Sequence, residues 1–250
     1  MYLAYFRFYA ELNDLLPPNR RQVSFAHHFK ERGSIKDVIE ALGVPHTEVD
    51  LILVNGESVA FSYLVQDGDR ISVYPLFTSI EIKSVSHVRP LPLCQTCFVL
   101  DVHLGKLATY LRLLGFDTLY RNDYQDEELA YLSSSDGRIL LTKDRGLLKR
   151  SMVTHGYLVR ESDPWLQLFE VLRRFELFGA SAPFQRCLRC NGLLQPVRKK
   201  LISDRLLPKT RQYYDEFRVC QVCSQIYWKG PHYERMQQFI NRVLQHDTSL

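Results

Sequence analysis

Long hydrophobic runs are missing from this chain of 250 residues, and so are three common enzyme motifs. No stretch approaches the ~18–20 apolar residues of a membrane helix, and residues 1–7 lack the basic and apolar regions of a secretory signal. We therefore expect a cytoplasmic protein that does not associate with membranes. The sequence has no Gly-x-Gly-x-x-Gly after its first α/β strand, no Gly-rich loop ending in Gly-Lys-Ser/Thr and no Gly-x-Ser-x-Gly. Dinucleotide-binding, P-loop and serine-hydrolase classes are thereby disfavoured.

Glycine and proline are also few, at 12 and 11 residues, which excludes collagen-like and low-complexity chains. The mean hydropathy of −0.20 is ordinary for folded protein. Charge is distributed unevenly: residues 1–82 carry 7 Lys and Arg against 11 Asp and Glu, whereas residues 186–218 carry 9 against 3. A basic segment is typical either of a polyanion-binding surface or of a solvated face, and charge alone does not separate the two.

The first 80 residues are predicted to form a small α+β domain. Its expected elements are strands at 2–8 and 21–28, a helix beginning at Ser34, a strand at 51–54 joined by an Asn55-Gly56 hairpin to a strand at 58–61, and a last strand at 71–74. This order is that of a β-grasp, or ubiquitin-like, fold. Sulfur carriers with this fold end in an exposed Gly-Gly, whereas this chain continues through Pro75, so sulfur transfer is not expected.

Residues 81–97 contain two prolines and few periodic apolar positions, so we expect a linker there. Strands and helices then alternate over residues 98–180. The expected strands lie at 98–101, 118–120, 138–142 and 157–160, and the expected helices at 104–114, 126–132 and 164–178. Such alternation predicts an α/β fold, with a mostly parallel sheet and flanking helices.

Acidic residues follow the expected strands of this region. Asp101 ends the first strand, Asp123 follows the second, Asp144 the third and Asp163 the fourth. Because the carboxyl ends of parallel strands meet at one edge of a sheet, these carboxylates would repel each other unless a cation such as Mg²⁺ or Mn²⁺ joined them. Such an ion can activate water for attack on a phosphodiester. The structural alternative is that each aspartate, Asp126 included, caps a helix or forms a turn.

Three stretches of the chain resemble the Mut-seven C-terminal RNase domain family, a member of the PIN-like nuclease group. They are residues 98–108, 111–117 and 141–145. The resemblance implies a ubiquitin-like domain at 1–80, a PIN-like nuclease core at 98–180, and a zinc ribbon with a C-terminal helix at 181–250. It also implies metal-dependent cleavage of RNA. Asp101 and Asp144 match the acidic positions of the family, and Asp123 and Asp126 lie in its intervening acidic segment.

Basic residues accompany these aspartates. Lys106 and Arg112 lie six residues apart on the first helix of this region, and Lys143 and Arg145 flank Asp144. We expect them to hold RNA phosphates beside the metal. Ordinary solvated charge is the alternative, and Arg145 is favoured over the others because it adjoins a candidate ligand. Asp163 is a further candidate for catalytic support.

Four cysteines form a paired motif near the C-terminus. Cys187-x-x-Cys190 and Cys220-x-x-Cys223 are separated by 29 residues. Each pair can occupy a tight turn, and together they predict a closed, structural Zn²⁺ site that stabilises a module too small to fold on a hydrophobic core. Cys94-x-x-Cys97 stands alone, and we expect a buried, inert pair, with metal binding or redox chemistry as alternatives.

The segment between the two zinc-ligand pairs carries basic and aromatic residues. Arg198, Lys199 and Lys200 are predicted to bind RNA, and Tyr227 and Trp228 lie beyond the second cysteine pair. Basic residues among aromatics suit single-stranded nucleic acid, through phosphate contact and base stacking. Alternatively, the two aromatic residues pack the ribbon against the nuclease core.

Three hypotheses follow. The first is a divalent-metal-dependent ribonuclease that cleaves single-stranded RNA at its aspartate cluster, with a protein partner for the ubiquitin-like domain. The second is a non-catalytic RNA- or ribosome-binding adaptor, and the third is a protein-interaction scaffold. We assign no role to His27, His28 and His46, which lie in the acidic N-terminal domain.

Overall fold

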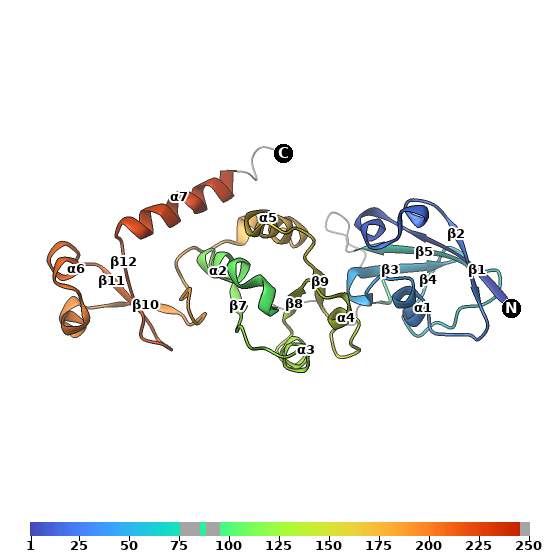
Figure 1. Cartoon of the computed structure of the whole chain (residues 1–250), viewed down its shortest axis with the longest axis horizontal. Helices are drawn as coiled ribbons and strands as arrows, with labels where there is room; N and C mark the ends of the chain where they lie inside the picture. The colour runs from blue at the N-terminus through green and yellow to red at the C-terminus, as the bar shows by residue number, and fades with distance from the viewer. Residues whose placement is uncertain (76–85, 89–95, 246–250) are drawn as a thin grey trace. The chain divides into compact units, whose positions relative to one another are not determined.

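The computed structural model describes residues 1–75, 86–88 and 96–245, and most of the expected linker, with Cys94, lies outside them. The chain divides into two compact units. The first combines Met1–Gln95 with Gln125–Leu158, and the second combines Thr96–Tyr124 with Val159–Leu250. Each unit thus holds a part of the region with alternating strands and helices (Figure 1). No helix in the described part of the chain has the length and apolar character needed to cross a membrane.

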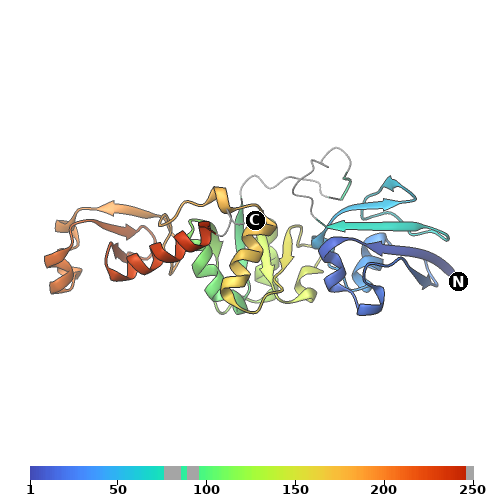
Figure 2. The same ribbon diagram turned by 90° about the horizontal axis from the view of Figure 1, so that it is seen from above.

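The N-terminal part of the first unit is a five-stranded sheet with the order β2-β1-β5-β3-β4. Its elements are β1 (Tyr2–Phe8), η1 (Ala10–Leu15), η2 (Pro18–Arg20), β2 (Phe25–Phe29), α1 (Ile35–Ala41), η3 (His46–Glu48), β3 (Val49–Val54), β4 (Glu57–Ser58) and β5 (Arg70–Pro75). The first and last strands, β1 and β5, lie side by side and run parallel (Figure 2). Alternate residues of both strands are buried, among them Phe6, Phe8, Ile71 and Val73. This is the predicted β-grasp fold.

Local signals explain most of these boundaries. Ser34 caps α1 by accepting the N–H of Asp37, and Asn55 and Gly56 form the β3–β4 turn with positive φ angles. The second strand begins at Phe25 and not at residue 21, because η1 and η2 occupy the connection. Asn13 stabilises this connection: its amide donates to two carbonyls and its Oδ1 accepts the N–H of Gln22 at 2.6 Å. The hairpin strand expected at 58–61 is shorter, and β4 ends at Ser58.

The rest of the first unit contains α3 (Asp126–Ser135), β8 (Ile139–Thr142), α4 (Arg145–Leu148) and β9 (Gly156–Leu158). All four residues of β8 are buried, and β8 runs parallel to β9, as expected for a strand covered on both faces. The short helix α4 was not predicted from the sequence. Two buried side chains join this part to the β-grasp sheet: Glu48 accepts the N–H of Leu158 at 2.6 Å, and His46 contacts the carbonyl of Val153.

The second unit begins with β6 (Cys97–Leu100), η4 (Val102–Leu104), α2 (Gly105–Leu113) and β7 (Asp117–Leu119), and β6 and β7 are parallel. Helix α5 (Pro164–Arg174) packs against α2. Gly115 ends α2 with φ +95°, and a Cβ there would collide with the carbonyl of Ala182. Only glycine satisfies both demands. The expected α/β class with mostly parallel strands and flanking helices is confirmed.

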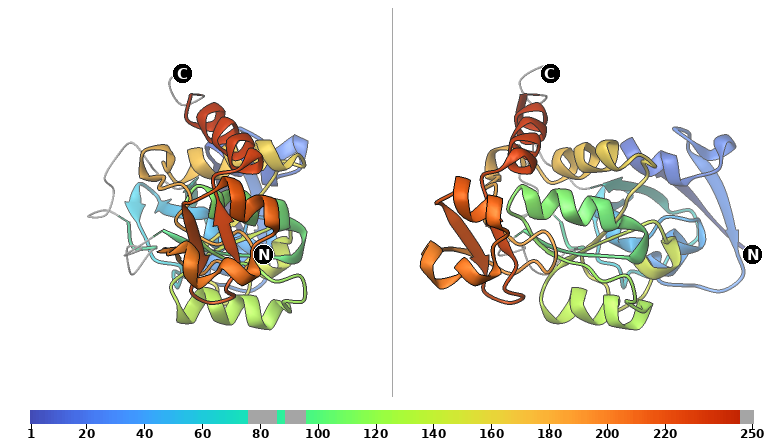
Figure 3. Two further views of the ribbon diagram at one scale, coloured as in Figure 1. Left: turned by 90° about the vertical axis from the view of Figure 1, so that its left-hand side faces the viewer. Right: turned by 60° about the vertical axis from the view of Figure 1, so that its left-hand side comes forward.

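After η5 (Phe178–Ala180), the second unit ends in a small antiparallel sheet, β10 (Leu194–Val197), β11 (Phe217–Cys220) and β12 (Ile226–Trp228). Between β10 and β11 lie η6 (Lys199–Leu201), η7 (Ser203–Arg205) and α6 (Pro208–Tyr213). Ile202, Leu206, Phe217 and Ile226 form its small core. The last helix, α7 (Pro231–Gln245), leaves this sheet (Figure 3), and the ring of Phe239 lies 4.6 Å from Tyr110 and 4.9 Å from Trp165.

Candidate functional site

Four cysteine sulfur atoms converge in the C-terminal sheet. The Sγ atoms of Cys187, Cys190, Cys220 and Cys223 all lie within 4.8 Å of one another. Cys187 lies 3.6 Å from Cys223, and Cys190 lies 3.4 Å from Cys220. A tetrahedral site with Zn–S bonds of ~2.3 Å requires sulfur atoms about 3.8 Å apart, so the four thiols fit zinc.

Two tight turns present these sulfur atoms. In the first turn, the N–H of Cys187 donates to the carbonyl of Gly192, and Asn191 adopts a φ of +71°. In the second, Cys220 donates its N–H to Gln225, and the N–H groups of residues 222 and 223 point at the Cys220 sulfur at 3.4 and 3.5 Å. The two turns thus present their sulfur atoms to one four-cysteine cluster.

The cysteines differ in acidity. Burial raises the pKa of the Cys187 thiol, but hydrogen bonds from Tyr227 and from the backbone of residues 190 and 189 outweigh it, and the pKa falls to about 7. Burial raises the pKa of Cys190 to about 12, and the sulfur atoms of Cys220 and Cys223 contribute in the same direction. Because neighbouring thiolates repel one another, a divalent cation is needed to hold all four in ionised form.

Tyr227 supports the first cysteine. Its hydroxyl lies 3.1 Å from the Cys187 sulfur and accepts the N–H of Leu188 at 3.1 Å. Burial and the contact with Cys187 raise the pKa of Tyr227, so the hydroxyl stays protonated and donates to the sulfur. Tyr227 therefore supports the four-cysteine cluster, a role that neither of the two expected alternatives described.

Arg112 is buried and bonds only to carbonyls of the protein among the contacts that the structure describes. Its residue is 3% exposed, and its guanidinium donates to the carbonyls of Thr118 (2.9 Å), Leu188 (3.1 Å), Arg189 (3.1 Å) and Tyr120 (3.4 Å). Burial lowers its pKa, while negative charge on Cys190 and Cys187 opposes that shift. The expected contact with RNA phosphates is wrong for this residue, because all these donors point into the protein. Arg112 instead joins β7 to the first Cys-x-x-Cys turn.

Asn191 and Arg186 reinforce this joint. The Asn191 side chain accepts the N–H of Thr118 at 3.0 Å and donates to Asp117 at 2.9 Å. Arg186 forms an ion pair with Asp117 at 3.0 Å and donates to the Gly115 carbonyl. The roles of Asn191 and Arg186 were not predicted from the sequence. The one local indication is that Asn191 directly follows Cys190 and therefore belongs to the first Cys-x-x-Cys turn.

Three of the predicted aspartates belong to the second unit. Asp101 follows β6, is 5% exposed, and accepts the N–H of His103 at 2.8 Å. Asp163 caps α5 by accepting the N–H groups of residues 165 and 166. Asp123 is exposed and pairs with Arg121 at 2.8 Å, which lowers its pKa. The capping role that we weighed as the alternative is thus real for Asp101 and Asp163.

The other two aspartates belong to the first unit. Asp144 is exposed two residues after β8 and caps α4 by accepting the N–H of Gly146 at 2.7 Å. Asp126 opens α3, where the helix dipole favours negative charge, and lies 3.5 Å from Arg150. The five predicted aspartates are thus divided between the two units, with three in the second unit and two in the first.

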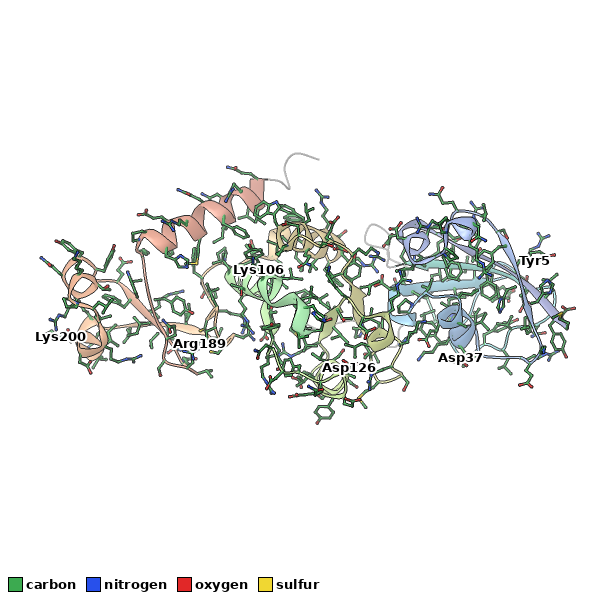
Figure 4. All side chains as sticks on the ribbon, viewed as in Figure 1. Tyr5, Asp37, Lys106, Asp126, Arg189 and Lys200 are labelled. Atoms are coloured by element: carbon green, nitrogen blue, oxygen red, sulfur yellow. The ribbon has the colours of Figure 1, made fainter. Side chains whose placement is uncertain are left out.

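Several of the predicted basic residues are on the surface. Lys106 is exposed on α2, and Arg198 and Lys200 are exposed on the ribbon, where Figure 4 labels Arg189 and Lys200. Lys199 pairs with Asp215 at 2.8 Å. Beside Asp144, Lys143 and Arg145 are exposed, and Arg145 donates to the carbonyl of Leu15 at 3.1 Å.

The fold and the four-cysteine site together define a ubiquitin-like domain followed by an α/β region that ends in a zinc-ribbon-type module. The family model of the Mut7-C RNAse domain matches residues 96–240, and that of the Mut7-C ubiquitin matches residues 1–81. The chain therefore belongs to the Mut7-C RNAse domain family, which is a nuclease-type family. No curated protein and no solved structure matches the chain.

Proposed function

We propose that this protein is a divalent-metal-dependent ribonuclease whose ion is held by Asp101, Asp144 and a carboxylate of the 123–126 segment. Family membership supports the nuclease class. The single observation that carries the residue assignment is that Asp101 follows β6 and Asp144 follows β8, each at the carboxyl end of a parallel-paired strand. In open α/β sheets this is the edge at which ligands bind.

The local hydrogen bonds suit this role. The caps made by Asp101 and Asp144 each engage Oδ1, so the backbone holds both carboxylates in defined orientations. Oriented carboxylates are the ligands that Mg²⁺ and Mn²⁺ prefer. An ion bound there would act as a Lewis acid on the scissile phosphodiester.

The neighbouring residues would bind and orient the strand. Lys143 and Arg145 flank Asp144 with exposed cationic groups that can pair with backbone phosphates. Lys106 is exposed on α2, the helix that follows Asp101. The zinc ribbon contributes further grip through Arg198, Lys199 and Lys200, and the ubiquitin-like domain recruits a protein partner.

The test is Asp144→Asn. Asparagine keeps an oxygen that can accept the Gly146 N–H, so the cap of α4 is retained while the charge is lost. We expect Mn²⁺-dependent cleavage of single-stranded RNA to fall by at least about 100-fold, because ligand charge is what binds the ion. The control is Asp14→Asn, an exposed aspartate on η1, which should cleave like the wild type.

Unchanged cleavage by Asp144→Asn would contradict the assignment. Salt-sensitive RNA binding by the wild type without turnover in Mg²⁺ or Mn²⁺ would point instead to the non-catalytic adaptor.

A further inference from the structure

Trp228 lies between two hollows of the zinc ribbon. One is a cleft of about 530 Å³, whose lining includes Trp228, Phe217, Phe184, Tyr233 and Met236. The second includes Trp228, Arg189 and Arg205 in its lining. Trp228 is 37% exposed at the end of β12, so its indole is accessible from solvent.

The walls of the first cleft are aromatic and held in place. The rings of Phe184 and Tyr233 stack with centroids 4.3 Å apart. A Cβ at Gly230 would lie 2.8 Å from the Trp228 Nε1, so a larger residue there would displace the indole. The volume falls within the ~300–1,000 Å³ typical of small-ligand sites, and it is ample for a nucleobase.

The charges of the two hollows differ. The two carboxylates that line the first cleft, Asp215 and Glu216, pair with Lys199 at 2.8 Å and Lys229 at 2.7 Å. The second hollow has two arginines and no carboxylate among its lining residues. Arg205 is oriented by its bond to the Ser224 carbonyl, and the backbone of Arg189 is held by Arg112. The first cleft also has Arg218 and Lys229 in its lining, but Arg218 donates to the Phe184 carbonyl and Lys229 is paired with Glu216. A largely aromatic cleft beside a hollow with two arginines is complementary to a ligand with an aromatic group and an anionic group.

We propose that these hollows form a nucleotide subsite for single-stranded RNA, in which one unpaired base enters the first cleft against Trp228 and an adjoining phosphate pairs with Arg189 and Arg205. An indole ring can stack on any of the bases, because every base has a π-face. The guanidinium group of arginine can form two parallel hydrogen bonds to a phosphate. The proposal rests on the proposed function, since it names how the same enzyme holds its substrate. An apolar protein segment would use the first cleft but would leave the two arginines without a counter-charge.

The test measures equilibrium binding of a fluorescein-labelled 12-nucleotide oligouridine by anisotropy. The full-length chain carries Asp144→Asn, and Mg²⁺ and Mn²⁺ are omitted, so that cleavage does not interfere. Trp228→Ala is expected to weaken binding about 5- to 150-fold, the range found for loss of one base stack. Trp228→Phe should recover most of it. The matched control is Tyr213→Ala, an exposed ribbon aromatic that lines neither hollow.

Two further readouts separate stacking from loss of folding. The chain has 2 tryptophans, so in Trp165→Phe the fluorescence reports Trp228 alone, and oligouridine should quench it. Arg189→Gln should lower the slope of log Kd against log salt concentration by about 0.7, whereas the exposed Arg211→Gln should affect it less. Zinc content, measured on every variant, confirms that the ribbon is intact.

Binding by Trp228→Ala within twofold of the Tyr213→Ala control, with zinc retained, would overturn the subsite and leave the cleft for a protein segment. Absence of quenching would do the same. A wild-type protein that binds through Trp228 but never cleaves contradicts only the proposed function. A wild-type protein that cleaves RNA, but whose RNA binding does not change in Trp228→Ala, contradicts only the subsite.

Discussion

The imidazole Nε2 of His46 lies 2.8 Å from the carbonyl oxygen of Val153, a residue 107 positions further along the chain. The other ring nitrogen lies 2.6 Å from Oε1 of Glu40. The buried ring therefore bridges two segments and links the β-grasp sheet to the loop between α4 and β9. The ubiquitin-like domain is therefore hydrogen-bonded to the segment that carries Asp144.

His46→Ala should destabilise the first unit by about 1–3 kcal/mol, because it leaves a buried carbonyl and a half-buried carboxyl group without their hydrogen-bonding partner. Urea unfolding followed by circular dichroism measures this change. His28→Ala, at an exposed position on β2, is the control and should change the free energy of unfolding by less than about 0.5 kcal/mol. Equal effects of the two substitutions would show that the His46 bridge contributes nothing.

Arg112→Lys should destabilise the second unit by about 2–4 kcal/mol, since an ammonium group cannot reach the carbonyls that the guanidinium fork bonds together. Thermal unfolding of the variant should begin at a lower temperature than that of the wild type. Lys106→Ala, on the exposed face of the same helix, should unfold like the wild type. A normal melting curve for Arg112→Lys would refute the structural role of this arginine.

Gly115→Ala should cost more than about 2 kcal/mol, because the added Cβ meets the Ala182 carbonyl in addition to the unfavourable positive φ. Gly137→Ala is matched to it: φ is +60° there, and nothing lies within 4 Å of the added Cβ. It should cost only about 1 kcal/mol. Chemical denaturation of both variants measures the loss in the free energy of unfolding and separates the collision with the Ala182 carbonyl from backbone strain. Equal losses in the two variants would exclude a contribution from the collision.

Purified protein should contain about one Zn²⁺ per chain, and Cys220→Ser should contain almost none. Elemental analysis measures the metal, and limited proteolysis should then cut the 187–228 region of Cys220→Ser rapidly, because the zinc site stabilises this small core. Cys97→Ser, outside the cluster, should keep its zinc and its resistance. Full protease resistance of zinc-free protein would show that the ribbon folds without metal.

Acidification should weaken the β-grasp domain through His27. Burial lowers the pKa of His27, and Arg20 and His28 add to the shift. The folded state thus binds fewer protons than the unfolded state, so stability falls as the pH drops through the unfolded value of about 6.5. His27→Gln should lose less stability than the wild type between pH 7.5 and pH 5.5 in urea titrations. Identical pH dependence in the two proteins would exclude His27.

Patterns between neighbours in the chain determined much of this protein. The Ser34 cap, the Asn55-Gly56 turn, the alternation of β1 and the pairing of parallel strands all follow from spacing and residue type. The four cysteines could be assigned in the same way, because each Cys-x-x-Cys turn is a local structure with little freedom. The expected fold class and the zinc-compatible cluster were confirmed on these grounds.

Contacts between distant segments were decided only in the tertiary structure. Nothing local marks Arg112 as buried beside the first zinc-ligand turn, His46 as bonded to residue 153, or Asn13 as the support of the β1–β2 connection. A polar side chain exchanges water for protein partners only where folding brings carbonyls and carboxylates around it, and no periodicity encodes that placement. The sequence alone determined which elements form and which sulfurs meet, whereas packing decided which of its charged residues are buried and which stay exposed to solvent.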